Sequence, residues 1–236
     1  MKLRDFFTGV KAGMPVCIGY FSVSFGFGAM AITQGLNIWQ AILVSASNLT
    51  SAGQFAGLTV IAAGAAIIEM VITQVVINSR YALMSLALGQ RLPPNTSTSQ
   101  RLLVAFFNTD EVFALGMSRG KGLTAAFFVG AGVVAALGWT SGTAMGAIAG
   151  SLLPGSLRAA LGVMLYGMFI AIVVPQAKEE KPILISVLLA LLVSCLFAWL
   201  PWLEKISGGL GIVISTVVAA TVCAIFFPVK DEELAQ

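Results

Sequence analysis

The sequence predicts an all-α integral membrane protein, built as a single polytopic transmembrane domain over residues 1–236. The chain is 58% hydrophobic and only 10% charged, whereas a soluble domain carries about 25% charged residues. Its mean hydropathy is +0.96. The apolar residues form runs that match the length of a membrane-crossing helix, about 20 residues. Too few polar residues are left for a water-facing surface, so lipid must be the solvent for most of the chain.

Charge-free runs divide the chain into about eight hydrophobic segments. No Asp, Glu, Lys or Arg occurs over residues 12–68, which leaves room for the first two segments. Pro154, Pro182 and Pro228 lie near the ends of later segments, because proline cannot continue a helix. The predicted segments are residues 12–33, a stretch that begins near residue 38, and then residues 64–88, 102–117, 121–141, 157–176, 183–202 and 206–227.

The second and fourth segments are interrupted by polar residues. The second contains the run SASNLTSAGQ at residues 45–54, and the fourth contains NTDE at residues 108–111. Non-helical backbone at membrane depth is tolerated only where protein or water covers it. These two segments are therefore either full crossings or re-entrant or broken ones. The chain then has eight full spans, or six full spans and two half-spans.

The positive charges predict that both termini are cytoplasmic, because Lys and Arg gather in cytoplasmic loops. Lys2, Arg4 and Lys11 precede the first segment. With eight crossings, Arg91 and Arg101 fall outside, against the rule; they return to the cytoplasmic side if the interrupted segments do not cross. The expected location is the inner (plasma) membrane, which the chain passes several times.

Ionisable side chains inside the hydrophobic segments are candidates for a solute site. A charge near the bilayer centre costs about 2.5–3.5 kcal/mol on insertion scales, so such residues face an interior or a cavity. Glu69 and Arg80 are too far apart along the third segment to pair, which makes Asp110 and Glu111 the candidate partners of Arg80. An amino acid would place its carboxylate on Arg80 or on the exposed N–H groups of a broken helix. Its ammonium would lie on Asp110, Glu111 or unwound backbone carbonyl groups. A structural ion pair, or an arginine that extends to the membrane interface, is the alternative.

Amide side chains supply further hydrogen bonds without formal charge, although they also serve to hold helices together. The three intramembrane acids are the groups able to take up a proton. The predicted substrate-binding residues are Asn48, Gln54, Asn78, Arg80, Asn108, Asp110 and Glu111. The predicted candidates for proton coupling are Glu69, Asp110 and Glu111.

Several kinds of chemistry are excluded by composition. The chain has no histidine, which excludes Ser-His-Asp triads and histidine-ligated metals. It has no GxxxxGK[ST] phosphate loop, so an ion gradient or downhill flow would drive transport unless a separate subunit supplies an ATPase. The net charge of +3 is scattered rather than gathered in a basic stripe. We therefore expect no catalytic residues, no metal, no cofactor and no nucleic-acid partner.

Glycines and tryptophans suggest how the helices pack. Glycine recurs at every fourth position over residues 138–150, a spacing that lets two helix backbones approach closely. This ridge is expected either to pack against another helix or to dock a partner protein. Trp139, Trp199 and Trp202 lie near predicted span ends, where tryptophan is usual at the membrane interface.

Four stretches in the first half of the chain form a recognisable set of motifs: residues 13–28, SAGQF at 51–55, INSRY at 77–81 and NTDEVF at 108–113. In this order they resemble the AzlC-type (azaleucine-resistance) branched-chain amino acid permeases of bacteria and archaea. The resemblance implies efflux of valine, leucine, isoleucine or similar amino acids, through a complex with a small AzlD-like membrane protein. Carried over residue by residue, it points at Gln54, Asn78, Arg80, Asp110 and Glu111.

Two other function classes stay open beside a transporter. An intramembrane enzyme with a carboxylate dyad would need two acids brought together, and such an enzyme usually has a second intramembrane aspartate. Apart from Asp110, the chain has only Asp5 and Asp231, which are terminal. An accessory or assembly subunit would use its polar residues only to hold helices together, and would carry no flux of its own.

Overall fold

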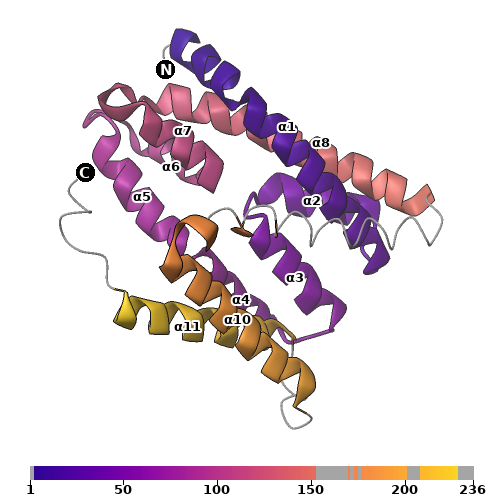
Figure 1. The fold of residues 1–236 in the computed structure, drawn as a ribbon. Coiled ribbons are helices and arrows are strands. Elements are labelled where there is room, and N and C mark those ends of the chain that lie inside the picture. Colours follow the sequence, from indigo (N-terminus) through magenta and orange to yellow (C-terminus); the bar gives the residue numbers. More distant parts are fainter. Residues whose placement is uncertain (1–2, 153–169, 171–172, 175–176, 201–207, 228–236) are drawn as a thin grey trace. The chain divides into compact units, whose positions relative to one another are not determined.

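The computed structural model describes residues 3–152, 170, 173–174, 177–200 and 208–227, and every regular element that it describes there is a helix (Figure 1). The all-helical prediction is thus confirmed for these residues. The helices are α1 (Leu3–Thr33), α2 (Ile38–Ser47), α3 (Ala52–Ala62), α4 (Ile67–Asn78), α5 (Arg80–Arg91), α6 (Thr98–Phe106), α7 (Asp110–Ser118), the short 3₁₀ helix η1 (Gly120–Gly122), α8 (Ala125–Leu152), α10 (Lys181–Trp199) and α11 (Gly208–Phe226).

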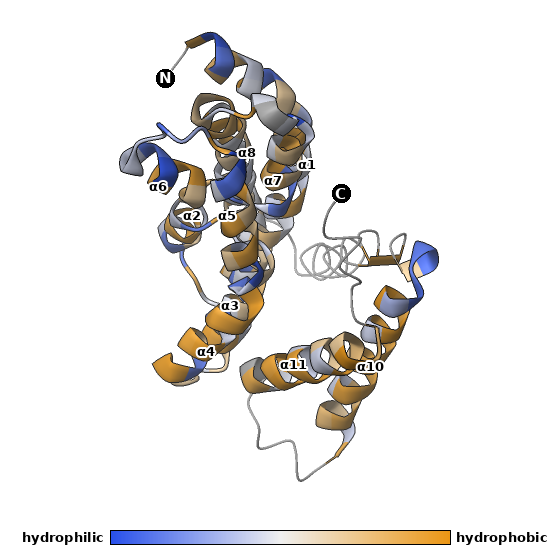
Figure 2. Cartoon of the chain, turned by 90° about the vertical axis from the view of Figure 1, so that its left-hand side faces the viewer, coloured by the Kyte–Doolittle hydropathy of each residue, from blue (hydrophilic) through white to orange (hydrophobic). Residues whose placement is uncertain are grey.

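Several of these helices are suited to a membrane. Among the described residues, α1, α8 and α10 are long and apolar enough to cross it, and α4 with α5 would add a fourth span as a bent pair. Figure 2 shows that α10 and α11 are hydrophobic over most of their lengths. The predicted count of eight segments is not confirmed. The sixth of them, residues 157–176, lies almost entirely outside the described residues.

Two long helices extend beyond the predicted segments. The first segment was expected to begin at residue 12, but α1 begins at Leu3 and continues through Pro15. The glycine-rich stretch after residue 141 was expected to follow the fifth segment, but it is the second half of α8. Glycine weakens an isolated helix, and here the packing of α8 against α1 compensates.

Three helix breaks interrupt the first half of the chain. Residues 48–51 separate α2 from α3, and residues 107–109 separate α6 from α7. Both interrupted segments are therefore broken helices. The third segment was expected to be continuous, but α4 and α5 meet at Ser79 with a bend of 44°. The run Asn78-Ser79 lies at the bend, and such side chains compete with the helix for backbone hydrogen bonds.

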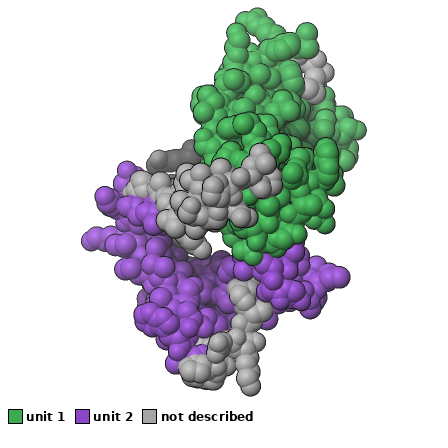
Figure 3. All heavy atoms as spheres, turned by 90° about the vertical axis from the view of Figure 1, so that its right-hand side faces the viewer, with its two compact units in different colours: residues 1–54, 78–165 green, residues 55–77, 166–236 purple. Residues whose placement is uncertain are grey.

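The chain groups into two compact units (Figure 3). Unit 1 comprises residues 1–54 and 78–165, and within it α8 contacts α1, α2, α6 and α7. Unit 2 comprises residues 55–77 and 166–236. In unit 2, α10 packs against α11, and the Ser194 hydroxyl donates a hydrogen bond to Ser215 Oγ at 3.2 Å. The single transmembrane domain stays a prediction.

The glycine ridge of α8 packs against α1, which lies alongside it (Figure 1). A Cβ atom at Gly142 would overlap the backbone of Phe21, and one at Gly146 would overlap the backbone of Phe25. The contact is reciprocal, because glycines of α1 lie equally close to the α8 backbone. The ridge is thus covered within unit 1, which leaves no room there for the partner that was the alternative expectation. The α1 glycines in this seam are Gly9, Gly13 and Gly28.

Candidate functional site

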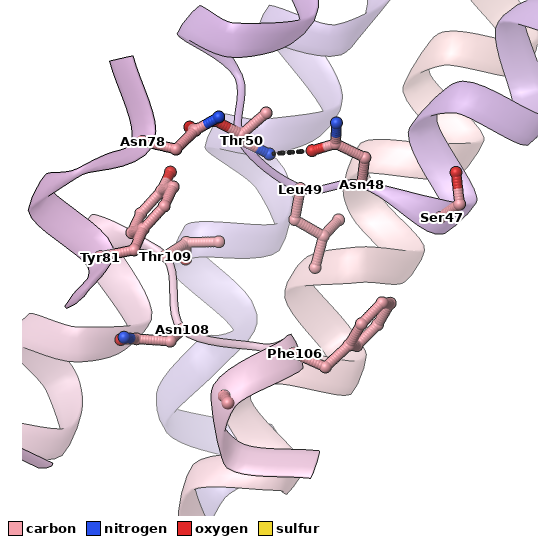
Figure 4. Close-up of a pocket in the computed structure, with 10 residues that line it drawn as sticks. Ser47, Asn48, Leu49, Thr50, Asn78, Tyr81, Phe106, Asn108 and Thr109 are labelled. Carbon is pink, nitrogen blue, oxygen red and sulfur yellow. Dashed lines mark hydrogen bonds between the residues drawn. The ribbon is translucent and has the colours of Figure 1, made fainter. Parts of the chain in front are cut away.

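A cavity of about 370 Å³ lies in unit 1 where the three helix breaks meet (Figure 4). The first break contributes residues 47–50, the bend at Ser79 contributes Asn78 and Tyr81, and the third break contributes residues 105–106 and 108–109. Its volume is within the range of about 300–1,000 Å³ that is usual for small-molecule sites. Segments that are separate in sequence therefore form one small-molecule-sized cavity.

The non-helical backbone of the first break, between α2 and α3, is stabilised by its own polar side chains. Asn48 ends α2 with an extended backbone, φ −149° and ψ 122°. Its side-chain oxygen accepts a hydrogen bond from the backbone N–H of Thr50 at 2.9 Å. This local bond offers the backbone an alternative to the helix. Ser51 follows with a φ of 44°, a left-handed conformation that residues other than glycine rarely adopt.

The cavity has a polar edge and an apolar wall. In Figure 4 the side chains of Asn48, Thr50 and Asn78 lie along one edge, and Leu49 and Phe106 lie below them. The Thr50 hydroxyl donates a hydrogen bond to Asn78 Oδ1, which joins the first break to the bend at Ser79. A ligand with one polar end and one apolar end would match this division.

Asn108 brings an unpaired acceptor to the cavity. Its amide donates a hydrogen bond to Ser85 Oγ at 3.1 Å, but its buried Oδ1 has no partner among the described residues. The side chain of Thr109, which lies near the Tyr20 phenol, also makes no hydrogen bond of normal geometry. An unsatisfied buried polar group costs about 1–3 kcal/mol. A bound solute that donates a hydrogen bond would remove this cost.

Arg80 and Asp110 form an ion pair with 2.8 Å between Nη1 and Oδ2. Neither lines the cavity, but each directly neighbours a lining residue in the sequence, Tyr81 and Thr109 respectively. The pair joins the first residue of α5 to the first residue of α7. Each side chain is 45% exposed, and exposed pairs contribute only about 0–1 kcal/mol to stability. Stability alone is therefore a weak reason for placing two charges here.

Glu111 has a separate partner, because its carboxylate accepts a hydrogen bond from the Tyr20 hydroxyl of α1. The two acids that are neighbours in sequence thus point at different partners. Asp110 pairs with a guanidinium and Glu111 with a phenol. A catalytic dyad needs two carboxylates that share a proton, and Asp110 and Glu111 are not arranged in this way.

Gln54 does not line the cavity, but it supports the residues of the first helix break that do. Its side-chain amide donates hydrogen bonds to the carbonyl groups of Asn48 and, at 3.3 Å, Val44. Its side-chain oxygen accepts a hydrogen bond from Trp139 Nε1 at 2.9 Å. Gln54 therefore links the end of α2 to α8 across the break.

Trp139 corrects one expectation. It was expected at the membrane interface but is only 1% exposed. A buried indole N–H usually finds a hydrogen-bond partner, and here that partner is Gln54. Its place next to Gly138 of the ridge did not predict this burial, because successive positions of a helix point about 100° apart. Trp199 is 81% exposed, and Trp202 lies outside the described residues.

The structure brings most of the predicted residues together, although their roles stay predictions. Asn48, Asn78 and Asn108 line the cavity, whereas Gln54, Arg80, Asp110 and Glu111 are held by partners beside it. Glu69 is buried in the first turn of α4, in unit 2, and is not a lining residue. The residues that the sequence did not single out are Tyr20 and Trp139, which pack against each other, and Tyr81 and Phe106, which line the cavity.

The family model for the AzlC protein matches residues 15–153, a range that contains every residue of the cavity. The chain belongs to the AzlC family. It is 28% identical over 188 residues to the inner membrane protein YgaZ of Escherichia coli, with 77% of each chain covered. It is also 28% identical over 182 residues to an uncharacterized membrane protein of Archaeoglobus fulgidus, covering 75% of this chain and 78% of that one. No solved structure matches the chain.

Family membership confirms the resemblance drawn from the motifs of the first half. The matched range begins within α1 and extends through α8, and it includes the three helix breaks and the part of the glycine seam that follows Pro15. These relatives are membrane proteins by name. AzlC-family membership, helices fit to cross a bilayer and a cavity at helix breaks are consistent with a permease-like role in the membrane.

Proposed function

We propose that this AzlC-family protein is a secondary transporter that exports branched-chain or similar hydrophobic amino acids across the inner membrane. It would act as the large subunit of a complex with a small AzlD-like membrane protein. The observation that carries the proposal is the meeting of three helix breaks around one cavity. Transporters commonly build their solute site from interrupted helices whose backbone groups face the solute.

The division of the cavity favours a hydrophobic amino acid. Leu49 and Phe106 offer an apolar surface for an aliphatic side chain, while Asn48 and Asn78 offer hydrogen bonds for the polar end. The unpaired Oδ1 of Asn108 would accept a hydrogen bond from the ammonium group. Apolar walls with a few placed polar groups are the usual composition of a small-molecule site.

The ion pair beside the cavity carries the same two charges as a zwitterion. The guanidinium of Arg80 would bind the substrate carboxylate, and Asp110 would bind its ammonium, each in exchange for part of its present partner. An arginine binds a carboxylate well because its planar donors match the two oxygens. Asp110, Glu111 and Glu69 are the proposed groups for coupling this movement to a proton gradient.

The test is efflux of labelled leucine and valine from proteoliposomes that contain the full chain, with and without the small partner protein. We expect saturable efflux that responds to a pH gradient. Asn78→Leu should reduce it by about five- to tenfold, because a lost hydrogen bond of this kind is worth roughly 1–1.5 kcal/mol. Asn95→Leu, in an exposed loop, is the matched control and should transport like the unchanged protein.

Two results would overturn the proposal in different ways. Absence of leucine and valine efflux under every gradient, with the partner present, would reject this substrate class. Normal efflux by Asn78→Leu would reject the cavity as the site. If the chain is an accessory subunit, it would also show no efflux of its own. If it is an intramembrane enzyme, it would not need a path for its substrate across the membrane.

A further inference from the structure

A second cavity, of about 300 Å³, lies in unit 1 between α5 and α6. Its wall includes Leu88, Leu92 and Val104, which are 2%, 6% and 3% exposed. These three side chains make an aliphatic surface buried in the protein. Ser85 and Arg101 add polar groups to the same cavity. None of these residues belongs to the substrate site described above.

The two cavities share part of their lining. Ala105 lines both of them. Beside it, the amide of Asn108, from the first cavity, donates a hydrogen bond to the hydroxyl of Ser85, from the second, at 3.1 Å. One shared residue and one hydrogen bond therefore connect the linings of the two cavities. A single hydrogen bond of this kind contributes little net free energy and can be exchanged.

Arg101 gives the second cavity a positive charge with no counter-charge among the described residues. Its Nε donates a hydrogen bond to the backbone carbonyl of Thr96 at 3.3 Å. In the part of the chain that the structure describes, no carboxylate forms an ion pair with it. A guanidinium next to a buried aliphatic wall is complementary to a molecule with a carboxylate at one end and an aliphatic side chain at the other.

We propose that the second cavity is a further binding site for the same hydrophobic amino acid, and that Ala105 with the Asn108–Ser85 hydrogen bond forms the gate between the two sites. The inference rests on the proposed function and adds that the substrate moves from the first cavity to the second within unit 1. The substrate carboxylate takes the place of Ser85 Oγ as the acceptor for the Asn108 amide, which opens the gate. The carboxylate then binds Arg101, and the aliphatic side chain packs against Leu88, Leu92 and Val104.

Protection of single cysteines by leucine tests the second site directly. The full chain, with its three native cysteines replaced by alanine, carries Ser47→Cys in the first cavity or Leu102→Cys in the second. Leu103→Cys, on α6 and in neither cavity, is the matched control, since both leucines are exposed. At about ten times its Kd, leucine should slow thiol modification about tenfold in both cavities, and should leave Leu103→Cys unchanged.

The outcomes separate this inference from the proposed function. Protection of Ser47→Cys without protection of Leu102→Cys would reject the second site and leave the transporter proposal intact. Protection of neither, together with absence of efflux, would reject both. Protection of Leu103→Cys to the same extent would show a general conformational change, which would also reject the assignment to a second site.

Charge removal supplies a second readout. Arg101→Gln should lower leucine efflux by at least about tenfold, because hydrogen bonds to charged groups are the strong ones. Arg101→Lys should recover part of the loss, and Arg91→Gln, at an exposed arginine that lines neither cavity, should have no effect. Protection of Ser47→Cys should persist in the Arg101→Gln protein, which shows that the first site is still folded. Unchanged efflux by Arg101→Gln would overturn the inference.

Discussion

The indole nitrogen of Trp139 lies 2.9 Å from the side-chain oxygen of Gln54 and donates a hydrogen bond to it. The amide of Gln54 in turn donates to the carbonyl of Asn48 at the first helix break. The ring of Tyr20 packs edge-on against Trp139 at 5.3 Å, and its hydroxyl donates to Glu111 just after the third break. Two aromatic side chains on α1 and α8 therefore brace two of the breaks around the cavity.

Replacing Trp139 by phenylalanine should weaken this brace. Trp139→Phe removes the donor to Gln54, whose oxygen keeps only the longer contact with Ser45 at 3.4 Å. We expect a loss of about 1–3 kcal/mol in unfolding free energy, the cost of a buried group left poorly bonded. Thermal unfolding in detergent measures it, and Trp199→Phe, at an exposed position, is the control. Equal stability of Trp139→Phe and the unchanged protein would refute the brace.

Variants of the Tyr20–Glu111 contact distinguish a structural role of Glu111 from a role in proton coupling. Glu111→Gln keeps an oxygen that can accept from the Tyr20 hydroxyl, so we expect little loss of stability. Tyr20→Phe removes the donor, and should destabilise by about 1–3 kcal/mol because it leaves the part-buried acceptor without its partner. If Glu111 couples transport to protons, Glu111→Gln should abolish the response of leucine efflux to a pH gradient. An unaltered response would rule out that role.

The ion pair of Arg80 and Asp110 has a structural alternative, which a double variant tests. We expect Arg80→Gln and Asp110→Asn each to lower leucine efflux by at least about tenfold, if each charge binds the substrate. The double variant should then be no better than either single one. Recovery of efflux in the double variant would show that the charges serve only to neutralise each other. Coupling in stability should stay below about 1 kcal/mol, since both side chains are half-exposed.

The glycine seam between α1 and α8 can be tested with two alanine substitutions in one helix. A Cβ atom at Gly28 would overlap the backbone of Thr143 and lie 2.7 Å from the backbone nitrogen of Ala147. Gly28→Ala should therefore destabilise by about 1–3 kcal/mol, as overpacking does. A Cβ atom at Gly19 meets nothing within 4 Å, so Gly19→Ala should stabilise by about 0.5–1 kcal/mol. Thermal unfolding in detergent measures the stability of both variants. Equal changes in stability for Gly28→Ala and Gly19→Ala would contradict this packing.

The parts of the structure that depend on neighbouring residues could be predicted from the sequence. The low charge content indicated a helical membrane protein, and the polar runs around Asn48 and Asn108 indicated where two helices break. The pairing of Arg80 with an acid of the fourth segment also followed, because a charge inside a hydrophobic segment needs a partner. Asp110 turned out to be that partner.

Features that depend on contacts between distant residues were not predictable. The cavity exists because residues 47–50 and 105–109 meet in space, and no spacing in the sequence encodes that contact. The burial of Trp139 depends on which face of α8 packs against its neighbours. The continuation of α8 through its glycines has the same origin, since the contact with α1 replaces the stability that glycine lacks. The bend at Ser79 was missed because an amide and a serine within a hydrophobic run also fit a straight helix.

Equilibrium binding of labelled leucine to the purified chain tests the central claim most directly. The account places the substrate at the three helix breaks, with Asn108 as an acceptor that is unpaired among the described residues. Asn108→Leu, which is similar in size but apolar, should weaken leucine binding by at least about tenfold. Asn95→Leu should bind leucine like the unchanged protein. Equal binding by Asn108→Leu and the unchanged protein would contradict the account.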